Sequence, residues 1–149
     1  MHTKQIGTLG EVAIAKDLIS KGYLVFTEIG DLSKIDLIAL KDNKLVRIQV
    51  KSYAEKNGIV NLYTTKSGPN YHFRYEEDTV DVFAVYVYNR NLIFYVSSKE
   101  LLKKRRSLAI RIDEGTSGQK IKANMSQNYI DFEKSLAYSS SHNEPSQMS

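Results

Sequence analysis

A carboxylate, an amide and an ammonium interrupt two segments that otherwise have the composition of buried β-strands. Asp36 lies in KIDLIAL, and Gln49 and Lys51 lie in KLVRIQVKS. Carboxylate and amide oxygens are hard ligands of the kind that Mg²⁺ binds in proteins. A lysine beside them can orient a water molecule or neutralise a growing negative charge. The three residue types therefore suit a site for a divalent cation, provided that the fold brings them together.

The two segments are expected to pair as a β-hairpin. Asp42 and Asn43 separate them and suit a two-residue turn. The register that follows places Asp36 directly across from Gln49, with Lys51 one diagonal step away on the same face. The valines and the isoleucine that alternate with these residues point to the other face.

Apolar neighbours indicate that the polar face of this hairpin is at least partly covered. Ile38 and Leu40 lie on the same face as Asp36. The alternative, which the residues alone leave open, is an ordinary antiparallel hairpin with an exposed polar face.

A second carboxylate lies in an amphipathic segment near the N-terminus. Residues 6–21 are predicted to form a helix, in which Ile14, Ala15 and Leu18 follow Glu11 at helical spacing. Glu11 should therefore point at the sheet, where an unpaired carboxylate is costly and a positive group is expected beside it. Two alternatives are a helix rotated to put Glu11 at its edge, and Glu11 paired with a lysine. The predicted apolar arc also includes Thr8, Val12 and Ile19.

The other segments predict one α/β or α+β domain with a mixed central sheet flanked by helices. We expect this domain to span residues 1–138, and the polar tail 139–149 to be disordered. The polar, tyrosine-rich segment 53–78 is expected to fold a small hairpin of its own. The remaining predicted elements are strands at 23–29, 79–88 and 92–97, a short basic helix in SKELLKKR, and a helix near 126–138.

Composition narrows the class of protein. The 149 residues are 42% hydrophobic, enough for one compact core. Cysteine is absent, which excludes disulfides and thiolate metal sites and favours an intracellular protein. No apolar run approaches the ~18 residues of a membrane span, so we expect a soluble, cytoplasmic protein.

The charge favours a polyanionic partner. The net charge is +4, and residues 99–122 alone contain eight cations and three anions. A basic run of this kind suits nucleic acid, although a solvated helix face is the alternative.

These residues in this order resemble the core of the PD-(D/E)XK, or restriction-endonuclease-like, nuclease superfamily. The matching positions are Glu11, Asp36, and the QVK sequence of Gln49, Val50 and Lys51. The resemblance covers about residues 5–53, and the strands at 79–97 fit the remainder of the core. Within the superfamily the chain most closely resembles the short bacterial homing endonucleases encoded by group I introns.

Two positions depart from the family pattern. Ile35 occupies the proline position of the motif, which takes no part in the chemistry. Gln49 replaces the usual Asp or Glu; its oxygen can coordinate a metal but carries no negative charge. The affinity for the metal is therefore expected to be lower.

The resemblance implies hydrolysis of DNA phosphodiesters with Mg²⁺ or Mn²⁺ as cofactor, leaving 5′-phosphate ends. Asp36 would be the central metal ligand, with Gln49 and the Val50 carbonyl beside it, and Glu11 a ligand or water-mediated partner. Lys51 would orient the attacking water or neutralise charge on the phosphate. A double-strand cut needs two such sites, so we expect a homodimer or a homotetramer on double-stranded DNA.

Contacts to DNA are expected mainly outside this core. Segment 53–75 directly follows the catalytic strand, and a two-stranded ribbon fits the major groove. An ordinary solvent-exposed loop is the alternative. The predicted DNA-contacting residues are Lys56, Asn57, Lys66, Ser67, Asn70, Tyr71, His72, Arg74, Lys103, Lys104, Arg105 and Arg106.

Two other functions remain open. One is a structure-specific nuclease of the Holliday-junction-resolvase kind, which the N-terminal sequence GTLGEVAIAKDLISKGYLVF also resembles. The other is a non-catalytic DNA-binding module on the same fold, in which Gln49 would mark the loss of catalysis.

Overall fold

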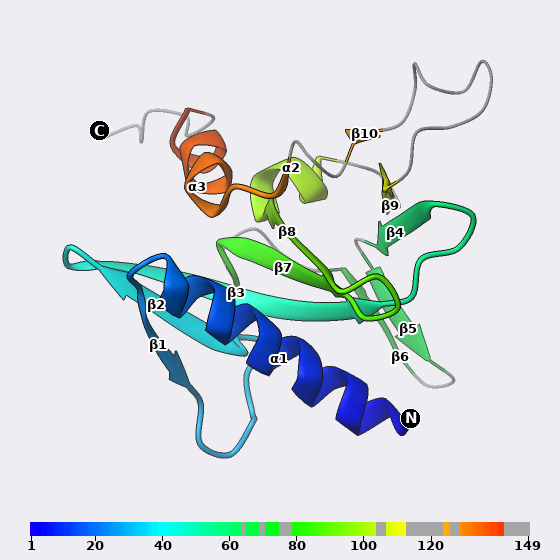
Figure 1. Ribbon diagram of the computed structural model, residues 1–149, viewed down its shortest axis with the longest axis horizontal. Helices are drawn as coiled ribbons and strands as arrows, with labels where there is room; N and C mark the ends of the chain where they lie inside the picture. The colour runs from blue at the N-terminus through cyan, green and yellow to red at the C-terminus, as the bar shows by residue number, and fades with distance from the viewer. Residues whose placement is uncertain are drawn as a thin grey trace.

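The computed structural model describes residues 1–63, 65–68, 71–74, 79–103, 107–112, 124–125 and 129–141. Its centre is a five-stranded sheet in the order β1-β2-β3-β7-β8 (Figure 1). β3 and β7 are parallel and the other neighbours are antiparallel, so the sheet is mixed, as predicted. Its strands are β1 (Leu24–Thr27), β2 (Leu37–Lys41), β3 (Lys44–Tyr53), β7 (Val82–Val87) and β8 (Leu92–Ser97).

Helix α1 (Thr3–Ser20) crosses one face of this sheet (Figure 1). It begins earlier than predicted because His2 caps it. The His2 ring accepts a hydrogen bond from the Lys4 amide, and the Gln5 side chain accepts one from the His2 amide. This reciprocal box satisfies backbone donors that the first helical turn leaves without partners.

The β2–β3 hairpin forms with the predicted register. Asp42 and Asn43 have φ values of 52° and 63°, which suit the two-residue turns that match the twist of paired strands. The pairing runs from Lys41 with Lys44 to Leu37 with Ile48. The apolar residues of the hairpin that pack under α1 are Leu37, Ala39, Val46 and Ile48.

Tyrosine–carboxylate hydrogen bonds tie two helices to the sheet. The Tyr95 hydroxyl donates to Asp17 of α1, and the Tyr23 hydroxyl donates to Glu133 of α3 (Phe132–Ser141). Phe132 packs edge-on against both tyrosine rings, with centroids 5.0 Å away in each case. Helices α1 and α3 therefore cover the same face of the sheet.

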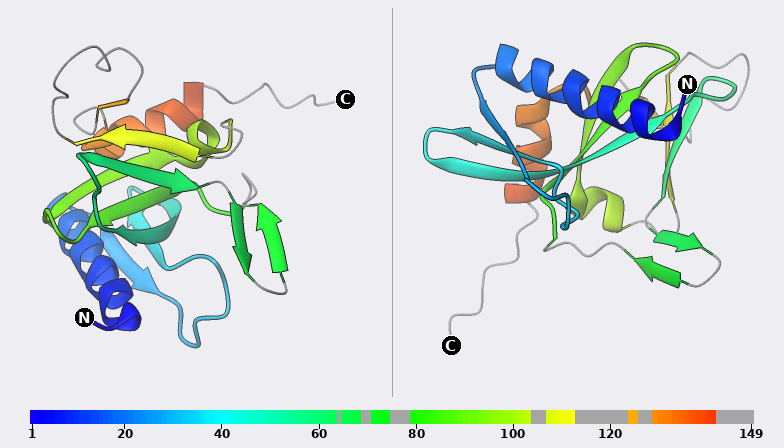
Figure 2. Two further views of the ribbon diagram at one scale, coloured as in Figure 1. Left: turned by 90° about the vertical axis from the view of Figure 1, so that its right-hand side faces the viewer. Right: turned by 90° about the horizontal axis from the view of Figure 1, so that it is seen from below.

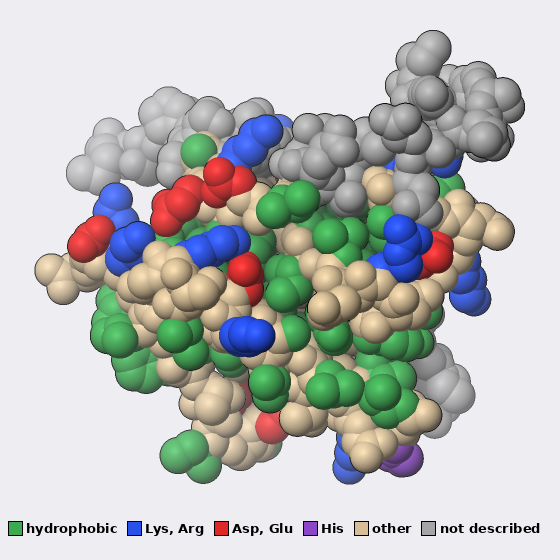
Figure 3. All heavy atoms as spheres, viewed as in Figure 1, with side chains coloured by type: hydrophobic (Ala, Val, Ile, Leu, Met, Phe, Trp, Pro, Cys, Tyr) green, Lys and Arg blue, Asp and Glu red, His purple; other side chains and the backbone are tan. Residues whose placement is uncertain are grey.

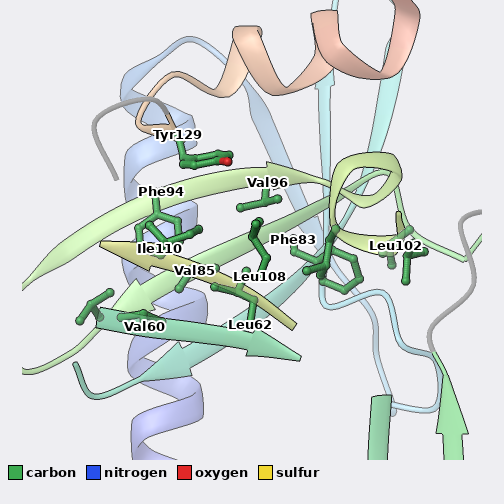
Figure 4. Close-up of a cluster of buried hydrophobic side chains, with 13 residues drawn as sticks. Val60, Leu62, Phe83, Val85, Phe94, Val96, Leu102, Leu108, Ile110 and Tyr129 are labelled. Atoms are coloured by element: carbon green, nitrogen blue, oxygen red, sulfur yellow. The ribbon is translucent and has the colours of Figure 1, made fainter. Parts of the chain in front are cut away.

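A second, smaller sheet covers the opposite face. It contains β10 (Asn124–Met125), β9 (Ser107–Arg111) and β4 (Ile59–Tyr63) in that order. Figure 4 shows how its apolar side chains meet those of the central sheet, with α1 on the far side. The side chains in this layer include Val60, Leu62, Leu108 and Ile110 from the small sheet and Phe83, Val85, Phe94 and Val96 from the central one.

Strands β4 and β9 were not predicted, although the sequence contained a signal for the first. Asn57-Gly58 is a strong dipeptide for a tight turn, and both residues have positive φ. The backbones of Lys56 and Ile59 exchange two hydrogen bonds of 3.0 Å across this turn. The turn directs β4 toward the second layer.

The polar segment after β4 contains the small hairpin that was expected. β5 (Thr65–Gly68) pairs with β6 (Tyr71–Arg74) as an antiparallel two-stranded ribbon that projects away from both sheets (Figures 1 and 2). The basic helix is shorter than predicted: α2 (Ser98–Leu102) ends before most of its cations.

The C-terminal helix is displaced from its predicted range. α3 begins at Phe132, later than the predicted start near 126, and continues to Ser141, inside the segment expected to be a disordered tail. Residues 142–149 lie outside those described. No helix among the described residues has the length and apolarity needed to cross a membrane.

Candidate active site

The β2–β3 pairing changes at Asp36, and this change determines where the carboxylate points. The backbone amide of Asp36 donates to the Ile48 carbonyl at 2.9 Å, although Ile48 is the pairing partner of Leu37. The ladder is therefore shifted by one residue, as in a β-bulge, which re-aims a side chain. Asp36 Oδ2 then accepts the Val50 amide at 2.7 Å. In place of the expected regular pairing of Asp36 with Gln49, the Val50 amide donates a hydrogen bond to the Asp36 carboxylate.

Glu11 and Asp36 share one pocket. Its volume is about 450 Å³. Glu11 comes from α1 and Asp36 from the bulge before β2, so two distant segments supply its acids. The pocket is also lined by Lys4, Gly7, Thr8, Thr27, Glu28, Asp31 and Ile35.

Both carboxyl groups bind protons more tightly than usual. Burial raises the pKa of Glu11 above its ordinary value, and the charges of Asp36 and Asp31 raise it further. Burial also raises the pKa of Asp36; the Val50 amide and the Lys51 ammonium oppose this, whereas the charges of Asp31 and Glu28 add to it. The site therefore concentrates negative charge in a partly desolvated place and favours a positive ion there.

Lys51 and Gln49 lie on β3, and neither is among the residues that line the pocket. Lys51 is close enough to lower the pKa of Asp36, and its Nζ lies 5.5 Å from the centroid of the Phe83 ring. Gln49 pairs with Phe83 in the parallel register, and it is not among the residues lining the pocket. Its Oε1 is buried without a hydrogen-bond partner in the described part of the chain. The structure thus brings Glu11 and Asp36 together in one pocket. Lys51 lies outside its lining and acts on Asp36 through its charge, and Gln49 keeps an unused acceptor.

The donor set fits a hard cation that keeps several water molecules. Mg²⁺ is typically held by one or two carboxylates and completes its shell with water and phosphate oxygens. Two carboxylates in one pocket match that preference. Within the described residues, no group of three or more His, Asp or Glu side chains is placed to hold a metal ion.

A glycine in α1 allows this helix to pack closely against β3. A Cβ on Gly10 would lie 2.1 Å from Ser52 Oγ and 3.3 Å from Val50 Cγ1, so any larger residue would force the Ser52 side chain to move. The helix turns toward this contact, which buries Ile14 and Leu18 and leaves Val12 exposed. The predicted apolar arc was wrong in this respect, because Val12 and Ile19 are 61% and 59% exposed.

We expect Gly10→Ala to destabilise the protein. In a helix interior, alanine is more favourable than glycine by about 1 kcal/mol. Overpacking of its methyl group against Ser52 costs about 1–3 kcal/mol, which is the larger effect. Ser52→Ala should restore stability in the double variant, because the remaining Ser52 Cβ would be 3.5 Å from the new methyl group. Urea unfolding of the two single variants and the double variant measures this coupling. Additive effects of the two substitutions would contradict the proposed contact.

Seven residues lining this pocket were absent from the sequence-based set of site residues, and the polar or charged ones among them with long or ionisable side chains are Lys4, Glu28 and Asp31. The acidic sequence EIGDLSKID, which ends at Asp36, was a visible signal for the last two. Nothing in the local pattern showed that this loop would fold back toward α1.

The predicted DNA-contacting residues lie in three places. Lys56 and Asn57 are exposed at the turn before β4, and Lys103 is exposed after α2. The backbone of the β5–β6 ribbon carries Lys66, Ser67, Tyr71, His72 and Arg74. Asn70, Lys104, Arg105 and Arg106 lie outside the described residues. Contact of any of these residues with DNA stays a prediction.

Two comparisons with known proteins give matches for this chain. A family model of PD-(D/E)XK endonucleases matches residues 1–132. The bacterial homing endonuclease I-Ssp6803I has a similar structure, with a TM-score of 0.74 and 20% sequence identity over 97% of this chain and 100% of that chain. A search of curated proteins gives no match. The structural likeness shows a shared fold, and the family match shows that the chain belongs to the PD-(D/E)XK endonuclease family.

Proposed function

We propose that the protein is a site-specific DNA endonuclease of the homing type that hydrolyses phosphodiesters with Mg²⁺. The observation that carries the proposal is the pocket lined by Glu11 and Asp36. The two carboxylates repel each other there, so a cation between them would be stabilised. The similarity to a homing endonuclease over nearly the whole chain supports the choice within the family.

The cation would be held by Glu11 and Asp36, with the amide oxygen of Gln49 and the Val50 carbonyl as further ligands. Asp36 is suited to this role because the Val50 amide fixes its Oδ2, and Oδ1 takes no part in that bond. When bound, Mg²⁺ would polarise the scissile phosphate and lower the pKa of a coordinated water.

Lys51 would act on the water and on the phosphate. Its ammonium can donate a hydrogen bond to the attacking water and offset the negative charge that grows on the phosphate oxygens. Its side chain extends beside Phe83, so the aromatic ring restricts where the ammonium can go. Each chain has one such site, and a homodimer is the smallest assembly that could cut both strands.

The test uses genomic DNA from the organism that encodes the chain. The DNA is incubated with the protein and Mg²⁺, adapters are ligated to 5′-phosphate ends, and the ends are sequenced. A few discrete sites are expected. Cutting at very many unrelated sites would contradict site specificity, and cutting of four-way junctions but not of linear duplexes would favour a junction resolvase. Binding without any cutting would contradict catalysis.

Mg²⁺ should stabilise the folded protein more strongly as the pH rises. The ordinary pKa values are 4.5 for Glu11 and 3.8 for Asp36, and both are raised by folding. The folded state therefore binds more protons than the unfolded state, and stability falls as pH rises through these pKa values. A cation that binds the ionised pair opposes this loss.

Thermal unfolding with millimolar Mg²⁺ and with EDTA, between about pH 5 and pH 7.5, measures this effect as a difference in Tm. Each kcal/mol should appear as about 2–4 °C for a chain of this size. A Mg²⁺ effect that is equal at both pH values, or larger at the acid one, would contradict metal binding by these carboxylates.

A further inference from the structure

The loop between β1 and β2 exposes two large apolar side chains. Ile29 is 98% exposed and Leu32 is 90% exposed, more than any other large apolar side chain in the described residues. The loop projects from the lower edge of the molecule, with hydrophobic side chains at its end (Figures 1 and 3). These two side chains, three residues apart on one loop, form a small apolar surface that a partner could cover.

Internal hydrogen bonds hold this loop in shape. The Glu28 carboxylate accepts the Ser33 amide at 3.0 Å and the Ser33 hydroxyl at 2.8 Å. The Ser33 hydroxyl oxygen in turn accepts the Ile35 amide at 3.2 Å. Gly30 and Asp31 adopt positive φ values of 103° and 50°, which turn the chain tightly between Ile29 and Leu32. The apolar side chains are therefore presented by a braced turn.

The same loop forms a wall of the candidate active site. Glu28 and Asp31 line the pocket that contains Glu11 and Asp36. Ile29 and Leu32 alternate with these acids along the chain and lie on the solvent side. A DNA strand with its phosphate at the pocket would place its neighbouring nucleotides against this loop.

The chemistry of the loop suits bases and sugars better than phosphates. Glu28 and Asp31 would repel a phosphate that is not neutralised by a metal. Apolar side chains inserted from the minor groove, in contrast, unstack a base step and bend the duplex. The β5–β6 ribbon projects from the same side of the molecule as the loop, so a duplex there could contact both elements (Figures 1 and 2).

We propose that Ile29 and Leu32 form an apolar wedge that enters the minor groove beside the scissile phosphate and opens the base step next to it. This inference rests on the proposed function. The wedge would make cleavage depend on how easily that step deforms, so flexible pyrimidine–purine steps would be favoured there without a hydrogen bond to any base.

The experiment uses a duplex that the wild-type protein cuts, taken from the sequenced genomic sites. 2-Aminopurine is placed at each position beside the cut, and its fluorescence is recorded on binding with Ca²⁺ in place of Mg²⁺. The variants are Ile29→Ser, Leu32→Ser and the pair. The matched control is Leu45→Ser, which removes a leucine that is 63% exposed at the end of the β2–β3 hairpin.

Wild-type protein should raise the fluorescence severalfold at one step beside the cut, and the paired variant should abolish this rise. The paired variant should also bind about tenfold more weakly, whereas the control should change binding less than about twofold. Sedimentation of all variants at the same concentration reports their assembly.

Each other outcome overturns the inference. Wild-type cutting without a fluorescence change, or equal effects of the paired variant and the control, would overturn it and leave the proposed function intact. A paired variant that loses self-association but keeps the fluorescence change would assign the loop to a second copy of the chain. Absence of cutting at any site by wild-type protein would overturn the proposed function as well.

Discussion

Asp36→Asn is expected to lower DNA cleavage by roughly a thousandfold or more and to raise the Tm of the metal-free protein. The loss of activity follows because the asparagine keeps the shape of the side chain but removes the negative charge of the proposed central ligand. The gain in stability follows because the pKa of Asp36 is raised, mainly by burial, so its ionised form is disfavoured in the folded state at neutral pH.

The hydrogen bond from the Val50 amide distinguishes Asp36→Asn from truncation of the side chain to alanine. An asparagine oxygen can still accept the Val50 amide, which now bonds Asp36 Oδ2 at 2.7 Å, whereas Asp36→Ala leaves that amide without its partner. The alanine variant should therefore be about 1–3 kcal/mol less stable than the asparagine variant. Asp42→Asn, in the exposed β2–β3 turn, is the matched control and should change neither property.

Single-turnover cleavage with Mg²⁺ and thermal unfolding in EDTA measure the two effects. Cleavage by Asp36→Asn within about tenfold of the wild-type rate would remove Asp36 from the mechanism. A lower Tm of this variant in EDTA would contradict the cost assigned to the buried carboxylate.

Lys51→Met is expected to reduce cleavage by about 10²–10⁴-fold while leaving DNA binding largely intact. Methionine keeps an unbranched apolar chain beside Phe83 and removes only the charge and the hydrogen-bond donors. Because the Lys51 charge lowers the pKa of Asp36, its removal should also shift Mg²⁺-dependent stabilisation to higher pH.

A surface lysine provides the control for this variant. Lys44→Met, at the exposed end of the hairpin, removes the same charge far from the pocket and should cut normally. Cleavage rates at saturating DNA, together with binding in Ca²⁺, separate chemistry from affinity. If Lys51→Met and Lys44→Met cut equally fast, Lys51 has no part in the reaction.

Much of the framework was predictable because it depends on local patterns. Asp42-Asn43 favours a two-residue turn, and a turn of fixed length with an alternating apolar pattern leaves one register for the β2–β3 hairpin. The apolar run of residues 79–88 likewise predicted the strand that forms β7. The order of Glu11, Asp36 and Lys51 along these elements then suggested the family, which the comparison confirmed.

Other elements had weaker local signals. Strand β9 is a short SLAIR segment beside a run of cations, and its burial comes from β4, which lies far away in the sequence. The end of α2 at Leu102 could not be predicted from the sequence either, because the basic residues that follow are good helix formers.

The sequence by itself determined the residue types of the site and the elements that carry them, because turn propensity and apolar period act over a few neighbouring residues. Only the tertiary structure decided how the groups meet. The bulge at Asp36 re-aims its carboxylate toward α1, and the close approach at Gly10 sets the rotation that exposes Val12 and turns Glu11 into the pocket. Both depend on contacts between segments far apart in the chain, where the fit of one side chain against another outweighs local preference.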